Sequence, residues 1–413
     1  PPLDPPDPAK GFQVRMPSYR LGPQSETENC RMSYYDISAP GLVPSEYLID
    51  CPGTFPGTND HGSNAGKCVA YSYRYFTQDP QSHHAIVGVY TGASNYDDPA
   101  WGQWKCRGKG VTETPCDPAN ASDCSGDSLC APALAEGNGC NTANGPDDFS
   151  SITRRGWTGA QESVSIADYP DGVYSMVPLK GLVSWNSHAF NLTNQEVWLD
   201  AYNNTYYTNN LTFQVRGGLD ISRIFVQHVA PFEEEEYCMT HTFAQGSRVF
   251  MITSHTHRHG KRFRYYWGPQ TECTGGNIVN ADPGCLPGAP ADIFYESYNY
   301  QDPVYMRFDP PLLFQGTKAE RTIKACSLFD NGKANPSEVK RQSTSPAHST
   351  SNLGGPCPNT TVACLGGANQ GALCYGNDDN CPDSICDACP ATGGLTTEDE
   401  MFAPSFRYYI DPE

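Results

Sequence analysis

The sequence predicts an all-β protein built from two domains. Gly (39) and Pro (35) are abundant among the 413 residues, and Tyr (24) and Phe (17) are plentiful, a mixture that favours short strands joined by tight turns. No apolar stripe with the period of a helix runs longer than about two turns. Alternating or β-branched runs that fit strands recur instead, at 11–17, 84–90, 174–177, 197–202, 211–215, 224–229, 248–253, 262–267 and 406–410.

The length accommodates two or three domains of ordinary size, and we expect a boundary at Arg216-Gly217-Gly218. Two β domains then span 12–216 and 217–413. Residues 1–11 form a Pro/Asp-rich tail that is expected to be disordered. Because the chain starts with Pro and has no initial apolar run, we expect a mature form whose signal peptide has been removed.

Eighteen cysteines indicate an exported protein. A reducing cytosol would keep them as thiols, so disulfides in an oxidising compartment are the simplest interpretation. Five Asn-x-Ser/Thr sequons agree with a secreted glycoprotein and are candidate glycosylation sites: Asn120, Asn191, Asn203, Asn210 and Asn359. We expect the protein to be extracellular or to reside in the lumen of the secretory pathway.

Two cysteine-rich segments, 106–140 and 357–389, differ from the rest of the chain. They consist largely of small and polar residues that cannot bury a core, so they are predicted to be loop insertions tied by local disulfides. The C-x-x-C at Cys386–Cys389 would also suit zinc or a redox dithiol, although disulfides are the better interpretation among so many other cysteines. Lys340-Arg341, followed by Ser, Thr and Pro, is predicted to mark an exposed, protease-sensitive connection.

Charge and hydropathy exclude two classes of partner. The net charge of −19 argues against nucleic acid, whose phosphates need a basic face, and it favours solubility. No run of eighteen apolar residues occurs, so a membrane span is not expected.

His255-Thr256-His257 is the sharpest candidate for a metal site. Residues two apart in a strand point to the same face, and the run before His255 reads as a strand, so both imidazoles could reach one ion. Zinc, copper and iron sites all use this pattern, and a pair of surface histidines on an edge strand is the plain alternative. His259 continues the period, but Gly260 beside it suggests a turn.

Three further residues are weaker candidates when taken singly. His83 and His84 are neighbours, so both could bind one ion only at a strand end or a bulge. His188 could equally be a buried core histidine. Met401 lies in an acidic turn that we expect to be exposed, where a thioether normally packs; as a ligand it would select Cu(I).

Taken together, these motifs resemble the copper type II, ascorbate-dependent monooxygenases, the family of peptidylglycine α-hydroxylating monooxygenase and dopamine β-hydroxylase. Val14-Arg15-Met16-Pro17 with Glu26 and Cys30 resembles the family's opening strand, and His83-His84 its histidine pair. His188 followed by Asn191 is similar to its third histidine. His255-Thr256-His257 with Gly260-Lys261 resembles the family's H-T-H-x-x-G-K motif. Glu400-Met401, which follows Thr397 and Asp399, resembles its late E-M motif.

The resemblance implies two antiparallel sandwich domains of jelly-roll type with two copper ions. His83, His84 and His188 would hold an electron-transfer copper in the first domain. His255, His257 and Met401 would hold the oxygen-activating copper in the second, with substrate beside it in a cleft between the domains. The implied reaction hydroxylates a C–H bond of a small molecule, with O2 as co-substrate and ascorbate as the reductant.

Departures from the family pattern concern the substrate and one disulfide. The peptide-hydroxylating members have an arginine two residues before the H-T-H, where this chain has Thr253. Arg258 should point to the opposite face of the strand, so we expect a neutral or aromatic substrate, contacted by aromatic residues such as Tyr265, Tyr266 and Phe406. The family's cysteine after the methionine is Phe402 here, which leaves Cys238 and Cys326 to find partners elsewhere, such as the second cysteine-rich segment.

Two other functions remain open at this point. The chain could be an extracellular structural or binding glycoprotein that keeps the copper-hydroxylase fold without turnover. The many disulfides, the insertions and the missing arginine favour this interpretation. Either protein could belong to an extracellular assembly. A zinc hydrolase would use His255 and His257 but leaves Met401 and the His83-His84 pair unexplained.

Overall fold

A computed structural model of the chain describes residues 3–52, 66–92, 94–132, 140, 145–147, 154–160, 163–270, 285–343, 357–394 and 396–411. The architecture is all-β, as the sequence predicts. The helical segments in this part of the chain are short 3-10 turns: η1 (Ser45–Tyr47), η2 (Pro99–Trp101), η3 (Ala121–Asp123), η7 (Pro290–Asp292), η8 (Ala319–Arg321), η9 (Pro336–Glu338) and η10 (Asp378–Asn380). The chain divides into two compact units between Val215 and Arg216, one residue from the expected boundary.

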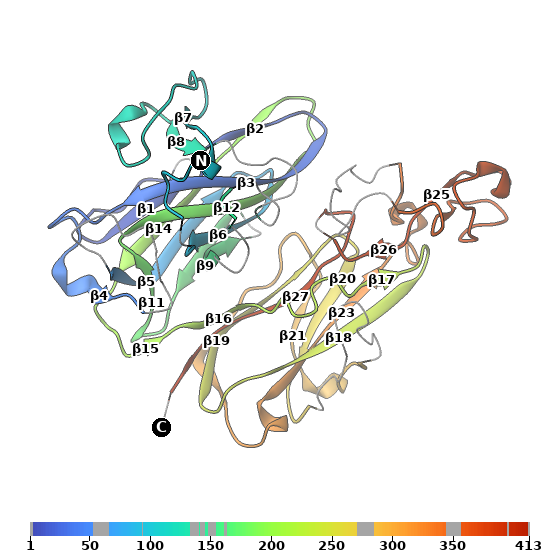
Figure 1. The fold of residues 1–413 in the computed structure, drawn as a ribbon. Coiled ribbons are helices and arrows are strands. Elements are labelled where there is room, and N and C mark those ends of the chain that lie inside the picture. The colour runs from blue at the N-terminus through green and yellow to red at the C-terminus, as the bar shows by residue number, and fades with distance from the viewer. Residues whose placement is uncertain are drawn as a thin grey trace. The chain divides into compact units, whose positions relative to one another are not determined.

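The first unit contains two main sheets (Figure 1). One has the order β1-β14-β5-β11-β15, with β4 and β10 also paired to β5, and comprises β1 (Gly11–Arg15), β4 (Leu48–Asp50), β5 (Lys67–Gln78), β10 (Val164–Asp168), β11 (Val173–Pro178), β14 (Ala201–Tyr207) and β15 (Phe213–Gln214). The other has the order β3-β12-β6-β9: β3 (Ser25–Asp36), β6 (Ser82–Tyr90), β9 (Arg154–Ala160) and β12 (Lys180–Asn191). Phe12 on β1 stacks on Tyr35 of β3, and Arg74 of β5 donates to the carbonyl of Trp157 on β9, so the two sheets face each other.

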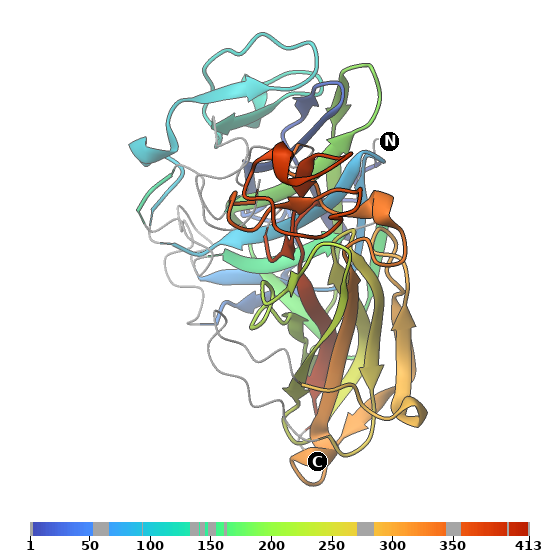
Figure 2. The ribbon, with the colours of Figure 1, turned by 90° about the vertical axis from the view of Figure 1, so that its right-hand side faces the viewer.

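The second unit is a pair of four-stranded antiparallel sheets whose strands lie alongside one another (Figure 2, yellow to dark red). Their orders are β16-β27-β19-β22 and β18-β23-β20-β21. The strands are β16 (Arg216–Leu219), β18 (Glu234–Thr242), β19 (Ser247–Thr256), β20 (Gly260–Tyr266), β21 (Ile293–Ser297), β22 (Met306–Phe314), β23 (Thr322–Asp330) and β27 (Phe402–Ile410). One buried apolar core draws residues from both sheets, which makes the unit a β-sandwich.

Four small two-stranded sheets complete the described structure. They are formed by β2 (Tyr19–Leu21) with β13 (Val197–Leu199), β7 (Trp104–Arg107) with β8 (Leu129–Pro132), β17 (His228–Val229) with β26 (Ala391–Thr392), and β24 (Ala363–Cys364) with β25 (Cys386–Ala388). The jelly-roll connectivity stays a prediction. Of the nine predicted strands, 84–90, 174–177, 248–253 and 406–410 lie inside observed ones, and 11–17, 197–202 and 262–267 overlap observed strands in most of their residues. Two runs match poorly, because only Phe213–Gln214 of 211–215 and only His228–Val229 of 224–229 are in a strand. The part of the chain described here has no helix long and apolar enough to cross a membrane.

The cysteines in the described segments are oxidised. Eight disulfides have both partners placed: Cys30–Cys140, Cys51–Cys68, Cys106–Cys124, Cys116–Cys130, Cys238–Cys326, Cys357–Cys389, Cys364–Cys381 and Cys374–Cys386. Cys386 and Cys389 each pair with a different cysteine, so they form neither a zinc ligand pair nor a redox dithiol. Two expectations are corrected. Cys238 and Cys326 are register partners on β18 and β23 and bond to each other, and Cys140 is bonded to Cys30, outside its own segment.

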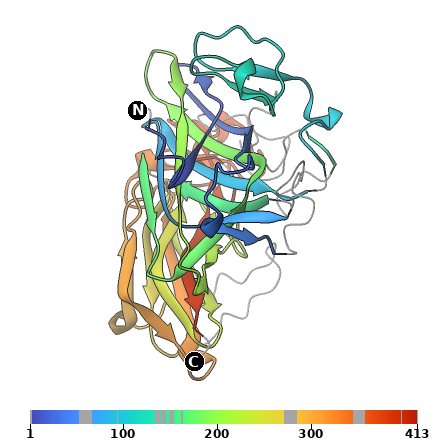
Figure 3. The same ribbon diagram turned by 90° about the vertical axis from the view of Figure 1, so that its left-hand side faces the viewer.

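The two cysteine-rich segments contain copies of one small structural module, here called the Cys modules, at residues 106–130 and 364–386. In each, the first cysteine bonds to the third and the second to the fourth. The first and fourth cysteines face each other on a two-stranded sheet. An asparagine-capped 3-10 turn precedes the third cysteine in both copies, at Asn120 and Asn377. The first module (cyan in Figure 3) projects beyond the main sheets of its unit.

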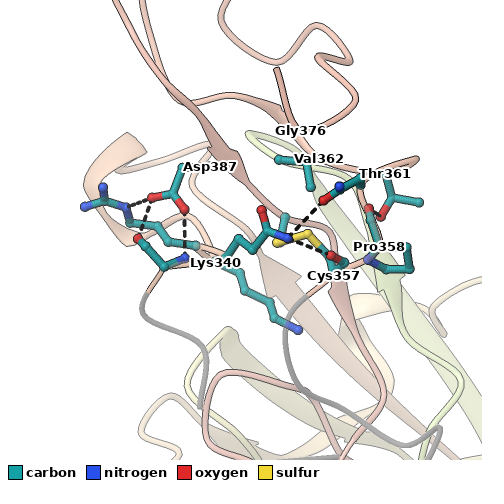
Figure 4. Close-up of a disulfide and its surroundings, with 12 residues drawn as sticks. Lys340, Cys357, Pro358, Thr361, Val362, Gly376 and Asp387 are labelled. Carbon is teal, nitrogen blue, oxygen red and sulfur yellow. Dashed lines mark hydrogen bonds and ion pairs between the residues drawn. A yellow bond between two sulfur atoms is a disulfide. The ribbon is translucent and has the colours of Figure 1, made fainter. Parts of the chain in front are cut away.

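Two further predictions are wrong, one about disorder and one about exposure. Residues 3–10 are not a disordered tail, because the carbonyls of Leu3 and Asp4 accept hydrogen bonds from the side chains of Gln13 and Asn204. Lys340-Arg341 is not an exposed connection either. Lys340 is 1% exposed and is drawn beside the Cys357–Cys389 disulfide in Figure 4. Arg341 donates to Asp387 Oδ2 at 2.8 Å. The Ser/Thr/Pro-rich stretch that follows lies largely outside the described residues.

Candidate metal centres

A β-bulge brings together the three histidines of the first unit. His188 on β12 faces His84 on β6, and the next register pair is Ala189 with Ser82, so His83 is the extra residue of the bulge. A bulge turns its extra side chain out of the alternation of the strand. This irregularity lets the neighbours His83 and His84 lie on the same side, which a regular strand forbids.

The three imidazole rings surround one point at nearly equal separations. Ring centroids are 5.3 Å apart for His83 and His84, 5.2 Å for His83 and His188, and 5.0 Å for His84 and His188. All three side chains are buried. Ring nitrogens of His83 and His188 lie within 4.8 Å of each other. A cluster of three buried imidazoles is a nitrogen donor set that suits copper, zinc or iron.

Glu26 on β3 orients His188. The His188 Nε2–H group donates to Glu26 Oε1 at 2.6 Å, which leaves the lone pair of the neutral ring on Nδ1. Burial lowers the pKa of His188, but the hydrogen bond and the negative charge of Glu26 outweigh it, and the pKa is raised from its ordinary value. Carboxylates in this position commonly fix the tautomer of metal-binding histidines.

In the second unit two adjacent strand ends bring His255 to Met401. His255 is near the end of β19 and pairs with Ala403 of β27, and Met401 immediately precedes β27. His255 Nε2 lies 3.2 Å from Met401 Sδ. Nitrogen and sulfur ligands bound at about 2.0 and 2.3 Å to one tetrahedral ion would lie about 3.5 Å apart, so the observed spacing suits a shared ion.

His257 completes this group. Its ring centroid is 5.2 Å from that of His255, and the rings are nearly perpendicular. The Nδ1–H group of His257 donates to the main-chain carbonyl of Asp399 at 3.2 Å, so the lone pair of the neutral ring is on Nε2. His257 and Met401 are buried and His255 is half-buried. The donor set of two imidazoles and one thioether is soft and favours Cu(I).

The acidic turn before Met401 is buried, which corrects the expectation that it is exposed. Glu400 and Asp399 are both 0% exposed. Glu400 accepts the main-chain N–H of His257 through Oε2 at 3.2 Å and that of His259 through Oε1 at 2.6 Å. Burial raises the pKa of Glu400 well above its usual value, while these two hydrogen bonds oppose the rise. The carboxyl group thus ties the H-T-H segment to the methionine turn.

His259 serves a different purpose from His255 and His257. Its Nδ1–H group donates to the carbonyl of Asp330 at the end of β23, 3.2 Å away, and the ring is 1% exposed. Burial and the nearby Arg258 lower the pKa of His259 to about 3, so the ring stays neutral. This is a core histidine held against the opposite sheet.

The residues expected to contact substrate are otherwise engaged. Tyr265, Tyr266 and Phe406 are almost fully buried, and Tyr265 and Phe406 belong to the apolar core between the sheets. Their presence therefore does not support an aromatic substrate. Arg258 is ion-paired with Glu398 and also donates to the carbonyl of Glu338, so its guanidinium is committed within the protein.

Burial separates the five sequons into two groups. Asn191 and Asn203 are both 0% exposed, and Asn191 Nδ2 donates to the carbonyls of Leu21, Gly22 and Gln195. A glycan on either residue would have no room, so these two candidates are wrong. The other three asparagines are exposed: Asn120, Asn210 and Asn359.

Sequence reasoning missed the supporting residues of both centres. From the sequence, Glu26 was considered only as part of a strand motif and Glu400 only as the neighbour of Met401. Their signals were weak: Glu26 and Glu28 are two carboxylates spaced for one face of a strand, and Glu400 lies in an acidic run. Comparison with known proteins does not add a family, since no protein-family model and no curated protein sequence matches the chain.

Proposed function

We propose that this protein is a secreted copper-dependent monooxygenase that hydroxylates a C–H bond of a small molecule with O2 and ascorbate. The observation that carries the proposal is the placement of the Met401 sulfur 3.2 Å from His255 Nε2, beside the ring of His257. Copper bound there would supply one-electron chemistry with dioxygen. Zinc has no redox chemistry and rarely takes a thioether ligand, so a zinc hydrolase fits this donor set less well.

The second support is the difference between the two donor sets. His83, His84 and His188 offer three nitrogens, which can serve both oxidation states of copper, whereas Met401 biases its site toward Cu(I). Glu26 would hold His188 in the tautomer that binds metal through Nδ1. Such an unequal pair of sites suits a protein that passes single electrons from one metal to the other.

The substrate is proposed to be neutral. Thr253, two residues before His255, is buried, and its carbonyl accepts a hydrogen bond from the Tyr265 hydroxyl. A substrate carboxylate in a partly dry site needs a fixed cation, typically a bidentate arginine. The committed contacts of Arg258 and the threonine at position 253 therefore favour substrates without a carboxylate.

Metal content and oxygen uptake test the proposal together. We expect two copper ions per chain after loading the metal-free protein with Cu(I), and O2 consumption that requires ascorbate and rises with a suitable neutral substrate. One equivalent of zinc with copper refused would contradict the copper assignment. Two bound coppers without ascorbate-dependent O2 uptake would favour the alternative of a non-catalytic extracellular glycoprotein.

A further inference from the structure

Lys340 is a buried cation next to the thioether centre. Its Nζ donates to Asp399 Oδ1 at 2.6 Å, and the two side chains are 1% and 0% exposed. The other carboxylate oxygen of Asp399 accepts from Thr396 Oγ1 at 2.7 Å. Burying an ion pair removes both charges from water, and an apolar pair of similar size is often at least as stable. The pair is therefore weak evidence for a stabilising role.

Asp399 links this ion pair to the ligands. Its main-chain carbonyl accepts the hydrogen bond from His257 Nδ1, and Met401 follows two residues later. A side chain fixed at both carboxylate oxygens leaves its own peptide group little freedom to rotate. The peptide group of the Asp399 carbonyl is also held by the Glu400 N–H, which donates to the carbonyl of Thr392 at 2.8 Å. Lys340 adds a constraint on the same turn through the Asp399 side chain.

Lys340 is itself held by the border of the second cysteine-rich segment. Its main-chain N–H donates to Asn331 Oδ1 at 2.9 Å, and its carbonyl accepts from the N–H of Cys389 at 2.8 Å. Asn331 Nδ2 also donates to the carbonyl of Cys389, at 2.9 Å. Cys389 is bonded to Cys357, and Figure 4 shows Lys340 beside this disulfide. The insertion therefore fixes the backbone from which the lysine reaches Asp399.

We infer that Lys340 is a positioning residue of the thioether copper site. Through Asp399 it holds the carbonyl that keeps the proton on His257 Nδ1 and the turn that presents Met401, and the cysteine-rich segment serves as its support. The metal part of this inference rests on the proposed function. The part that concerns the His257 tautomer does not, because it can be measured without copper.

The test uses the full chain and three variants: a double variant of Lys340 and Asp399, a control at Lys333, and a variant of His257 for signal assignment. Lys340→Met alone leaves the buried carboxylate without a cation and risks a folding defect, so the decisive variant is Lys340→Met combined with Asp399→Asn, which removes both charges. Lys333→Met is the matched control, because Lys333 forms an exposed ion pair with Glu234. The ¹⁵N shifts of the histidine rings in the metal-free protein report the tautomer, with His257 assigned by its absence in a His257→Gln variant.

In the double variant we expect a mixture of His257 tautomers, whereas the wild type and the Lys333 control keep the proton on Nδ1. Competition with a Cu(I) chelator should show the thioether site weakened about 10- to 100-fold, as for other changes to residues behind a metal ligand, with the His83/His84/His188 site unchanged. X-ray absorption should show a smaller copper–sulfur contribution.

A folded double variant with the wild-type tautomer and wild-type Cu(I) affinity would overturn the inference and leave Lys340 a purely structural residue. If the wild type binds no copper, the proposed function fails, but the tautomer of His257 still decides the role of Lys340. A shift of that tautomer in the double variant would then support positioning, and an unchanged tautomer would refute it.

Discussion

Glu400 offers the sharpest test of how the second metal centre is built. Both of its carboxylate oxygens accept main-chain N–H groups, from His257 at 3.2 Å and from His259 at 2.6 Å. Glu400→Gln keeps the size of the side chain but replaces one acceptor with an NH2 donor. We expect the remaining oxygen to stay on the closer partner, His259, so the new donor would face the N–H of His257.

The expected cost follows from the hydrogen bond lost. Leaving one buried N–H unsatisfied costs about 1–3 kcal/mol, so Glu400→Gln should destabilise the metal-free protein by that amount. Glu400→Ala leaves both N–H groups without an acceptor, so the loss in free energy of unfolding should be about twice as large, before any penalty for the cavity. Glu236→Gln is a matched control, because Glu236 pairs with Arg262 at a partly exposed position and should change stability by less than about 1 kcal/mol.

Urea unfolding of the metal-free variants, with residue-resolved hydrogen exchange over His255–Lys261, measures both the cost and its location. Exchange at His257 should accelerate more than exchange at His259 in Glu400→Gln. Wild-type stability and exchange in Glu400→Gln would refute the reasoning, because they would mean that only one oxygen of Glu400 acts as an acceptor.

Three further outcomes are expected. Met401→Leu should change the free energy of unfolding by less than about 1.5 kcal/mol but weaken Cu(I) binding. Met401→Ala should weaken Cu(I) binding and also lower the free energy of unfolding by about 2–5 kcal/mol, because it leaves a buried cavity. Cu(I) binding by Met401→Leu as tight as that of the wild type would make the methionine a packing residue. Mass spectrometry of protein from a glycosylating host should find no glycan at Asn191 or Asn203, and any glycan present should be on the exposed sequons, Asn120, Asn210 and Asn359. Burial raises the pKa of Asp387, but hydrogen bonds from Ser343 and Arg341 outweigh this effect, so the pKa is lowered overall. The contribution of Asp387 to stability is therefore present above the unfolded pKa of about 3.8 and is lost as pH falls through the folded pKa. Asp387→Asn should speed hydrogen exchange at residues 341–343 more at pH 7 than at acidic pH, and an equal effect at both would contradict this.

The sequence carries the local part of each centre. His255 and His257 lie two apart in a strand-like run, and the need for a bulge at His83-His84 follows from strand geometry alone. The position of the bulge depends on which residue of β12 lies opposite, and that strand is about a hundred residues further on. Pairing at this range is not encoded in any local pattern.

The supporting contacts are non-local for the same reason. Glu400 is bonded to main-chain groups 141 and 143 residues earlier, and Lys340 lies 59 residues before Asp399. Composition alone suggests that such charged side chains are exposed, because Lys, Glu and Asp are rarely buried unless paired. Each is buried here with a partner that only the fold supplies, which is also why the turn before Met401 and the Lys340-Arg341 pair were assigned to the surface.

The two copies of the Cys module bear on how the chain can be compared with other proteins. Because its first and fourth cysteines lie side by side on paired strands, the polypeptide enters and leaves each copy at a single place. A single point of entry and exit is what an insertion needs if the strands of its host are to keep their register. In the second copy the half-cystines themselves make up most of a small buried cluster, which replaces an ordinary apolar core. The cysteine order is the same in 106–130 and 364–386 while two of the three spacings differ by one residue, so the two copies differ in loop length. Alignments of the two host domains with other sandwiches should therefore be made after both Cys modules have been excised.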